Sequence, residues 1–102
     1  MIGVYAQAII KTRYAQEFEK IAQHLVDKAQ KEQGMVSYNF GSLTTDEQPA
    51  EHREYAFIER WESIEDLETH MDTEHFKKAD QQCQHLLASP MQITIYELPT
   101  AS

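Results

Sequence analysis

The residues best suited to chemistry are concentrated in segment 59–76, ERWESIEDLETHMDTEHF. It contains the single tryptophan of the chain, Trp61, together with His70, His75 and seven carboxylates. Histidine is the side chain whose ordinary pKa suits a general base near neutral pH. Tryptophan supplies a flat apolar wall with one N–H donor. The segment could therefore line a pocket for a flat molecule, or it could be an amphipathic surface rich in titratable groups.

The two histidines are candidates for the base, and each also has a structural interpretation. His75 falls in the first turn of a predicted helix, where the helix N-terminus disfavours the imidazolium and keeps the ring neutral. It could equally be a polar side chain that orders the helix start. His70 follows Leu67 by three residues and therefore leans toward the core, where it could fix a break between two helices. We treat His75 as the first candidate for the base and His70 as the second.

The acidic residues of the segment fall into two groups. Glu59 shares a strand face with Trp61, so we expect it to be paired or to lie near a rim, because a buried unpaired carboxylate is costly. The other acids are typical of helix starts and solvent-facing charges. We expect no metal site, because His70 and His75 are separated across a helix break and no H-E-x-x-H spacing is present.

Composition limits the classes of protein to which this chain can belong. Its 102 residues fit one domain, 1–102, with a small core. Lys and Arg total 9 against 17 Asp and Glu, and no basic run alternates with aromatics, which argues against nucleic acid and anionic membranes as partners. No apolar stretch reaches the ~20 residues that span a bilayer. The N-terminus lacks signal-peptide features and Cys83 is the only cysteine, so we expect a cytoplasmic protein without a disulfide or a cysteine-bound metal.

The apolar spacing predicts strands and helices in the order βαββαβ. One helix is expected over 14–31, ended by Gly34, and a second helical unit is broken in two, with caps at Ser63 and around Thr73 and an end at Pro90. The expected strands are 1–11, 35–43, 54–62 and 91–98. This order predicts an α+β fold of the ferredoxin-like type, an antiparallel sheet with its helices on one face.

Both faces of the predicted sheet carry apolar residues. On the third strand Phe57 and Trp61 point one way while Ile58 points the other, and on the first strand Tyr5 lies opposite the main apolar face. An antiparallel sheet with one wet face should instead alternate apolar with polar residues. Because the helices cover only one face, we expect a second copy of the chain to cover the other in a homodimer.

The pieces IERWES, SIEDLETH and TEHF give this segment a family resemblance. Segment 57–76, about a fifth of the chain, resembles the antibiotic biosynthesis monooxygenase domain family, most closely its small bacterial quinol monooxygenase branch. The resemblance implies a dimeric α/β barrel, in which two ferredoxin-like sheets pack face to face. It also implies a monooxygenase that uses no metal, flavin or other cofactor and whose partners are a small aromatic substrate, a quinol or polyphenol, and dioxygen.

Such a reaction requires an apolar slot for a ring, a base and donors for developing oxyanions. With His75 and His70 as candidate bases, the candidate substrate-binding residues are Trp61, Tyr5, Asn39, Phe57 and Phe76.

The chain departs from two branches of relatives with this fold. Asp80 stands where haem-degrading relatives have a histidine ligand, and the first strand has no asparagine, so haem is not expected. Phe57 and Leu67 stand near the positions where polyketide-oxidising relatives have asparagine and tyrosine. Two other functions fit the same residues: a binding module for a small aromatic or signalling metabolite, and an isomerase-like enzyme that transfers protons.

Overall fold

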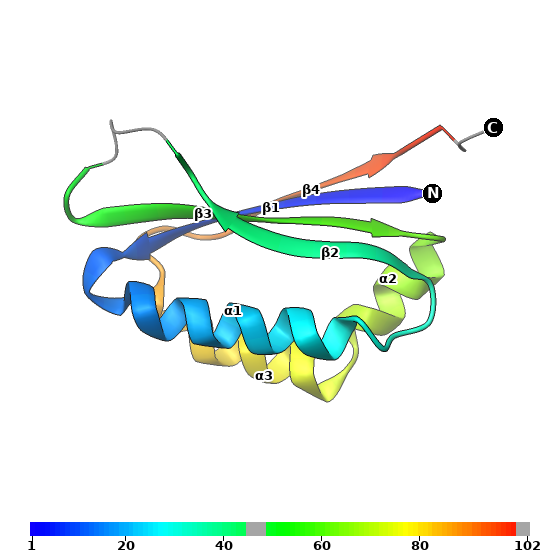
Figure 1. Cartoon of the computed structure of the whole chain (residues 1–102), viewed down its shortest axis with the longest axis horizontal. Coiled ribbons are helices and arrows are strands. Elements are labelled where there is room, and N and C mark those ends of the chain that lie inside the picture. The colour runs from blue at the N-terminus through cyan, green and yellow to red at the C-terminus, as the bar shows by residue number, and fades with distance from the viewer. Residues whose placement is uncertain (45–48, 100–102) are drawn as a thin grey trace.

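The computed structural model describes residues 1–44 and 49–99, which form one four-stranded sheet with its helices on a single face (Figure 1). The sheet order is β2-β3-β1-β4, and every neighbouring pair is antiparallel. The strands are β1 (Ile2–Lys11), β2 (Met35–Ser42), β3 (His52–Trp61) and β4 (Gln92–Glu97). The helices are α1 (Ala15–Ala29), α2 (Ile64–Met71) and α3 (Glu74–Cys83), with 3-10 turns η1 (Thr12–Tyr14) and η2 (Gln84–Leu86). The ferredoxin-like βαββαβ fold predicted from the sequence is confirmed.

The break in the second helical unit is built by two caps. The Ser63 hydroxyl accepts from the backbone N–H of Asp66 at 3.2 Å and starts α2. The Thr73 hydroxyl accepts from the N–H of Phe76 at 3.2 Å and donates to the carbonyl of His70 at 2.7 Å. Thr73 therefore starts α3, as the sequence predicted, and also ties it to the end of α2.

Three element ends differ by two or more residues from the sequence expectation. Helix α1 ends at Ala29, two residues before the expected end at 31. Strand β3 begins at His52, two residues early, because it continues its pairing with β1 as far as Lys11. Helix α3 ends at Cys83 rather than at Pro90, because the chain after η2 returns to the sheet. There Leu87 bridges Ile10, and the N–H of Ala88 donates to the Ile9 carbonyl at 2.8 Å.

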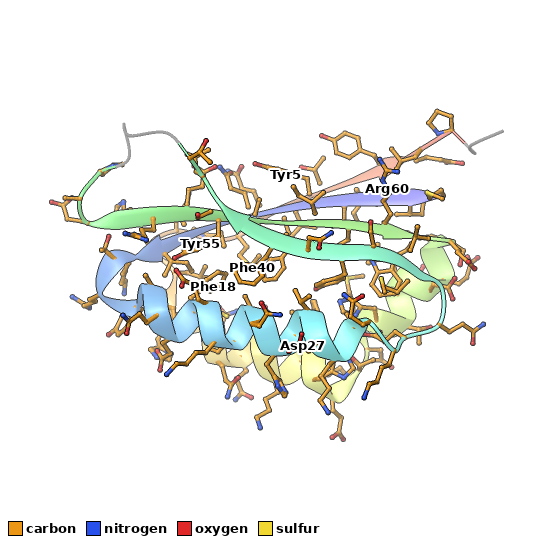
Figure 2. All side chains as sticks on the ribbon, viewed as in Figure 1. Tyr5, Phe18, Asp27, Phe40, Tyr55 and Arg60 are labelled. Atoms are coloured by element: carbon orange, nitrogen blue, oxygen red, sulfur yellow. The ribbon has the colours of Figure 1, made fainter. Side chains whose placement is uncertain are left out.

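The core lies between the sheet and the helices, and it follows the predicted strand phase. Tyr55, Phe57 and Trp61 of β3 are buried on the helix-facing side, while Ile58 between them is 57% exposed on the other side. Figure 2 shows Phe18, Phe40 and Tyr55 between the layers. None of the helices in the described ranges is long and apolar enough to cross a membrane.

The face of the sheet opposite the helices carries large exposed side chains. Tyr5, Ile58 and Tyr96 are 40%, 57% and 53% exposed, and Figure 2 shows Tyr5 and Arg60 on this side, away from the helices. Register places Tyr5 beside Ile58 on adjacent strands, so these apolar groups are contiguous. We propose that a second copy of the chain covers this open face.

Replacement of Ile58 by Glu should disrupt this dimer. An unpaired charge in a buried interface costs about 3–5 kcal/mol, which weakens self-association at least about a hundredfold. Sedimentation equilibrium at micromolar concentration should give a dimer for the wild type and a monomer for Ile58→Glu. The control is Ile64→Glu, the same change at a residue that is 38% exposed in the first turn of α2. A monomeric wild type would contradict the interface.

Candidate functional site

A cavity lies between the sheet and the three α-helices. Its volume is about 70 Å³, or about 700 Å³ when all the empty space out to open solvent is included. Ile93 and Ile95 line it although they are 54% and 45% exposed, because the helices leave this side of β4 uncovered. The cavity therefore opens toward the β4 edge. Apolar lining groups predominate, and the polar ones are Tyr38, Glu59, His70 and Asp80.

The cavity is smaller than a ring requires. A cavity of about 150 Å³ holds a benzene molecule, so an aromatic ring must also occupy the open side or displace a wall. Met71 and Met91 line the cavity, and methionine side chains repack easily around irregular shapes. The cavity is therefore a narrow apolar slot, and Met71 and Met91 are the lining side chains that can repack around a ring.

Glu59 is a buried carboxyl at the polar end of this slot. It is 6% exposed in the apolar phase of β3, and its Oε1 accepts from Trp61 Nε1 at 2.9 Å. Burial raises the pKa of Glu59 to about 7, although hydrogen bonds from Trp61 and Tyr38 act in the opposite direction. A carboxyl group with a pKa near 7 can accept or donate a proton under neutral conditions.

Tyr38 links Glu59 to His70 through polar contacts. Tyr38 is hydrogen-bonded to Glu59, and its hydroxyl lies 3.2 Å from His70 Nε2. Burial, and then the charge of Glu59, raises the pKa of Tyr38 well above its usual range, so the phenol keeps its proton. Burial also lowers the pKa of His70, which is 1% exposed and hence neutral near pH 7.

Glu32 joins the two histidines on the far side of His70. Its Oε2 lies 2.8 Å from His70 Nδ1 and 2.8 Å from His75 Nε2. Glu32 comes from the turn after α1, where its N–H donates to the carbonyl of Ala29 at 3.0 Å. A continuous hydrogen-bonded chain therefore starts at Glu59, which lines the cavity and also accepts from Trp61. It runs through Tyr38, His70 and Glu32 to the partly exposed His75.

The structure brings together only some of the residues predicted for the site. His70, Phe57 and Phe76 line the cavity. Trp61 is fully buried but does not line it: its ring packs against His70 with the centroids 4.7 Å apart. His75 is 24% exposed and contacts Glu32, so it lies outside the cavity rather than reaching Trp61 across it.

Tyr5 and Asn39 lie on the open face of the sheet, away from the cavity. Both pair with Ile58, Tyr5 from β1 and Asn39 from β2, so they flank it on the side opposite the helices. Within one chain they cannot contact a molecule held beside His70. Their predicted role in binding would require a second site or a second copy of the chain.

Sequence reasoning missed two members of the hydrogen-bonded chain. Glu32 follows a helix in a turn, where no periodicity distinguishes it from other surface acids. Tyr38 alternates with Phe40 in a strand and was indistinguishable from a core aromatic. The sequence does indicate Glu59 as a buried polar group, because it is a charged residue in the apolar phase of a strand, between Phe57 and Trp61.

This chain is similar to known proteins both in sequence and in fold. The sequence model described as antibiotic biosynthesis monooxygenase matches residues 1–82. A conserved protein from Methanosarcina mazei is 27% identical with a TM-score of 0.81, over 93% of this chain and 89% of that one. A protein described as an antibiotic biosynthesis monooxygenase is 23% identical with a TM-score of 0.82, over 97% and 99%, which shows the common fold.

A curated relative is longer than this chain. The Synechocystis protein sll1783, described as uncharacterized, is 28% identical over 89 residues. The match covers 87% of this chain and 57% of that protein. The chain therefore spans little more than half the length of this relative.

The stability of a Glu59→Gln variant should depend on pH differently from that of the wild type. Because the folded-state pKa of about 7 lies above the ordinary 4.5, the folded protein holds this proton more tightly. This tighter binding of the Glu59 proton stabilises the folded protein. The stabilisation is fully present below about pH 4.5 and is lost as pH rises through about 7. Glutamine keeps both hydrogen-bonding atoms without ionising. The free energy of unfolding of Glu59→Gln should therefore rise relative to that of the wild type, by up to roughly 3 kcal/mol, as pH increases from about 4.5 through about 7.

Urea denaturation from pH 4.5 to 8 measures this difference. Glu62→Gln is the matched control, because Glu62 is exposed just beyond the end of β3 and should give a nearly constant difference. A flat difference for Glu59→Gln as well would show that Glu59 is ionised in the folded protein throughout this range.

Proposed function

Because the chain belongs to the antibiotic biosynthesis monooxygenase family, we propose that it is a monooxygenase that oxidises a quinol or polyphenol with dioxygen and without a bound cofactor. The observation that carries the proposal is a titratable carboxyl, Glu59, at the polar end of an apolar slot. An electron-rich aromatic molecule needs only a base and an apolar binding site to react with dioxygen itself.

Glu59 is the proposed proton acceptor from the substrate hydroxyl. Its pKa of about 7 is matched to that task, and Trp61 Nε1 holds one carboxyl oxygen in place at 2.9 Å. Tyr38 can receive the proton on its oxygen while its own hydrogen passes to His70 Nε2, 3.2 Å away. His70 therefore acts as the second acceptor, and Glu32 orients its ring through Nδ1.

The oxidation balances without an added reductant. Loss of the hydroxyl proton gives an electron-rich phenolate, which transfers one electron to dioxygen. Recombination of the resulting radical pair forms a carbon–oxygen bond at a ring carbon. Cleavage of the O–O bond with loss of water then leaves one oxygen atom on the ring, so a quinol becomes a hydroxyquinone. All four electrons that reduce dioxygen come from the substrate.

The apolar walls have two effects in this proposal. They hold a flat ring by contact with aromatic and aliphatic side chains, among them Phe57 and Phe76. They also exclude water from the reacting atoms, which strengthens the hydrogen bonds of Tyr38 and Glu59. His75 lies outside these walls and contributes by holding Glu32.

Oxygen uptake with a panel of benzo- and naphthohydroquinones tests this function, using protein treated with a chelator. We expect uptake with the wild type that increases as pH rises through about 7, where Glu59 loses its proton. Glu59→Gln should lower kcat by about 10²–10⁴-fold, the usual effect of removing a general base. Glu62→Gln, a change of the same chemistry at an exposed position, should leave kcat unchanged.

Two outcomes would contradict the proposal that the chain is an oxygenase. Saturable binding of the hydroquinones with no oxygen uptake would indicate a binding module for a small aromatic molecule. Exchange of substrate hydrogen with solvent deuterium without uptake would indicate a proton-transfer enzyme. Equal kcat in Glu59→Gln and wild type would exclude Glu59 as the base and leave His70 as the base to test next.

A further inference from the structure

Three side chains of types that can act as metal ligands, His70 among them, converge between α1, α2 and α3. Glu32 Oε2, His70 Nδ1 and His75 Nε2 all lie within 4.8 Å of one another, and the carboxylate oxygen is 2.8 Å from each nitrogen. The three residues come from different elements, namely the turn after α1, the last turn of α2 and the first turn of α3. Their convergence is a product of the fold rather than of local sequence.

The helix break brings the two histidines together although they lack an H-E-x-x-H spacing. Thr73 caps α3 and holds the His70 carbonyl at 2.7 Å, so the chain turns sharply between the two histidines. The turn brings the imidazole rings to a centroid separation of 6.3 Å. An H-E-x-x-H spacing describes two ligands on one continuous helix, and it does not apply to ligands on two helices joined by a cap.

We propose that Glu32, His70 and His75 bind one divalent transition-metal ion of the zinc class. Two imidazoles and a carboxylate form a common ligand set for zinc and for neighbouring first-row metals. Ligand atoms about 2.1 Å from one ion are about 3.0–3.4 Å apart for bond angles between 90° and 109°. The observed 2.8 Å oxygen–nitrogen separations therefore need to widen by only a few tenths of an ångström, and the two nitrogens, which lie within 4.8 Å of each other, need to reach the same range.

The surroundings of His70 favour a ligand role. Its second ring nitrogen, Nε2, contacts the Tyr38 hydroxyl at 3.2 Å, and its ring packs on Trp61 and Phe76. A fixed partner on the non-ligating nitrogen sets the tautomer and orients the ring, as is usual for metal-bound histidines. With the ion on Nδ1, the proton of His70 resides on Nε2 and points at the Tyr38 oxygen, so the metal-bound form lacks the Nε2 acceptor that the proposed proton relay uses in the metal-free form.

An ion can reach this site from solvent without passing through the cavity. His75 and Glu32 are 24% and 13% exposed on the outer side, whereas His70 is 1% exposed. Water can therefore fill the remaining coordination positions. The chain's net charge of −8 also favours the approach of cations. The proposal does not depend on oxygenase activity, because binding is measured without substrate.

Titration of chelator-stripped, dialysed protein with Co²⁺ provides the test. Trp61 is the single tryptophan and its ring lies 4.7 Å from that of His70, so paramagnetic Co²⁺ on His70 should quench its fluorescence. We expect quenching that saturates at one ion per chain, visible absorption bands of low-symmetry Co²⁺, and reversal of both by Zn²⁺. His75→Ala and Glu32→Gln should each weaken binding at least about tenfold.

The matched control is His85→Ala, a surface histidine paired with Glu17 at 3.8 Å and 65% exposed, which should bind Co²⁺ like the wild type. Circular dichroism confirms that each variant is folded, and the near-isosteric Glu32→Gln provides a second measurement if His75→Ala unfolds. No saturable quenching in the wild type, or equal affinities in wild type and Glu32→Gln, would overturn the proposal. The three residues would then form a hydrogen-bonded cluster only.

Discussion

The polar interior of this protein depends on the burial of one carboxyl group. Glu59 occupies a position where the alternation of β3 calls for an apolar residue, and an unpaired charge there would destabilise the fold by several kcal/mol. Trp61 and Tyr38 satisfy its oxygens, and burial makes the neutral form accessible near pH 7. The Tyr38 hydroxyl that is hydrogen-bonded to Glu59 also contacts His70, whose Nε2 lies 3.2 Å from the phenol oxygen.

The rest of the hydrogen-bonded chain follows from the same requirement. Both ring nitrogens of buried His70 lie within hydrogen-bonding distance of a partner, Nδ1 at 2.8 Å from the Glu32 carboxylate and Nε2 at 3.2 Å from the Tyr38 hydroxyl. In the described ranges no buried side-chain nitrogen or oxygen lacks a hydrogen-bond partner. A fully satisfied network of this kind holds its members in one arrangement. The apolar slot is thereby given a rigid polar end, while its opposite side at β4 stays open.

Much of the fold could be predicted from the sequence because strand alternation and helix caps are local signals. The phase of Tyr55, Phe57 and Trp61 and the caps Ser63 and Thr73 depend on neighbours within a few residues. The end of α3 could not be predicted locally, because the bridge between Leu87 and Ile10 ends it from a distant part of the chain.

The site could be predicted only in part. His70, Phe57 and Phe76 follow from composition, phase and family resemblance, and they do line the cavity. Trp61 has the right phase, but its large ring fills the layer behind His70, which only the packing reveals. Glu32 enters through a turn, and its distance from His75 of 43 positions along the chain gives no sequence signal.

The turn that carries Glu32 also depends on a residue that is part of neither the cavity lining nor the hydrogen-bonded chain. Gly34 has φ of 79°, a conformation that disfavours any residue with a side chain, and a Cβ there would collide with the Asp66 carboxylate at the start of α2. Its carbonyl accepts from the N–H of Glu62 at 2.8 Å, which anchors the turn at the end of β3. In a saturation library, position 34 should therefore tolerate substitution as poorly as the buried polar residues. Depletion at that position would report backbone geometry rather than chemistry.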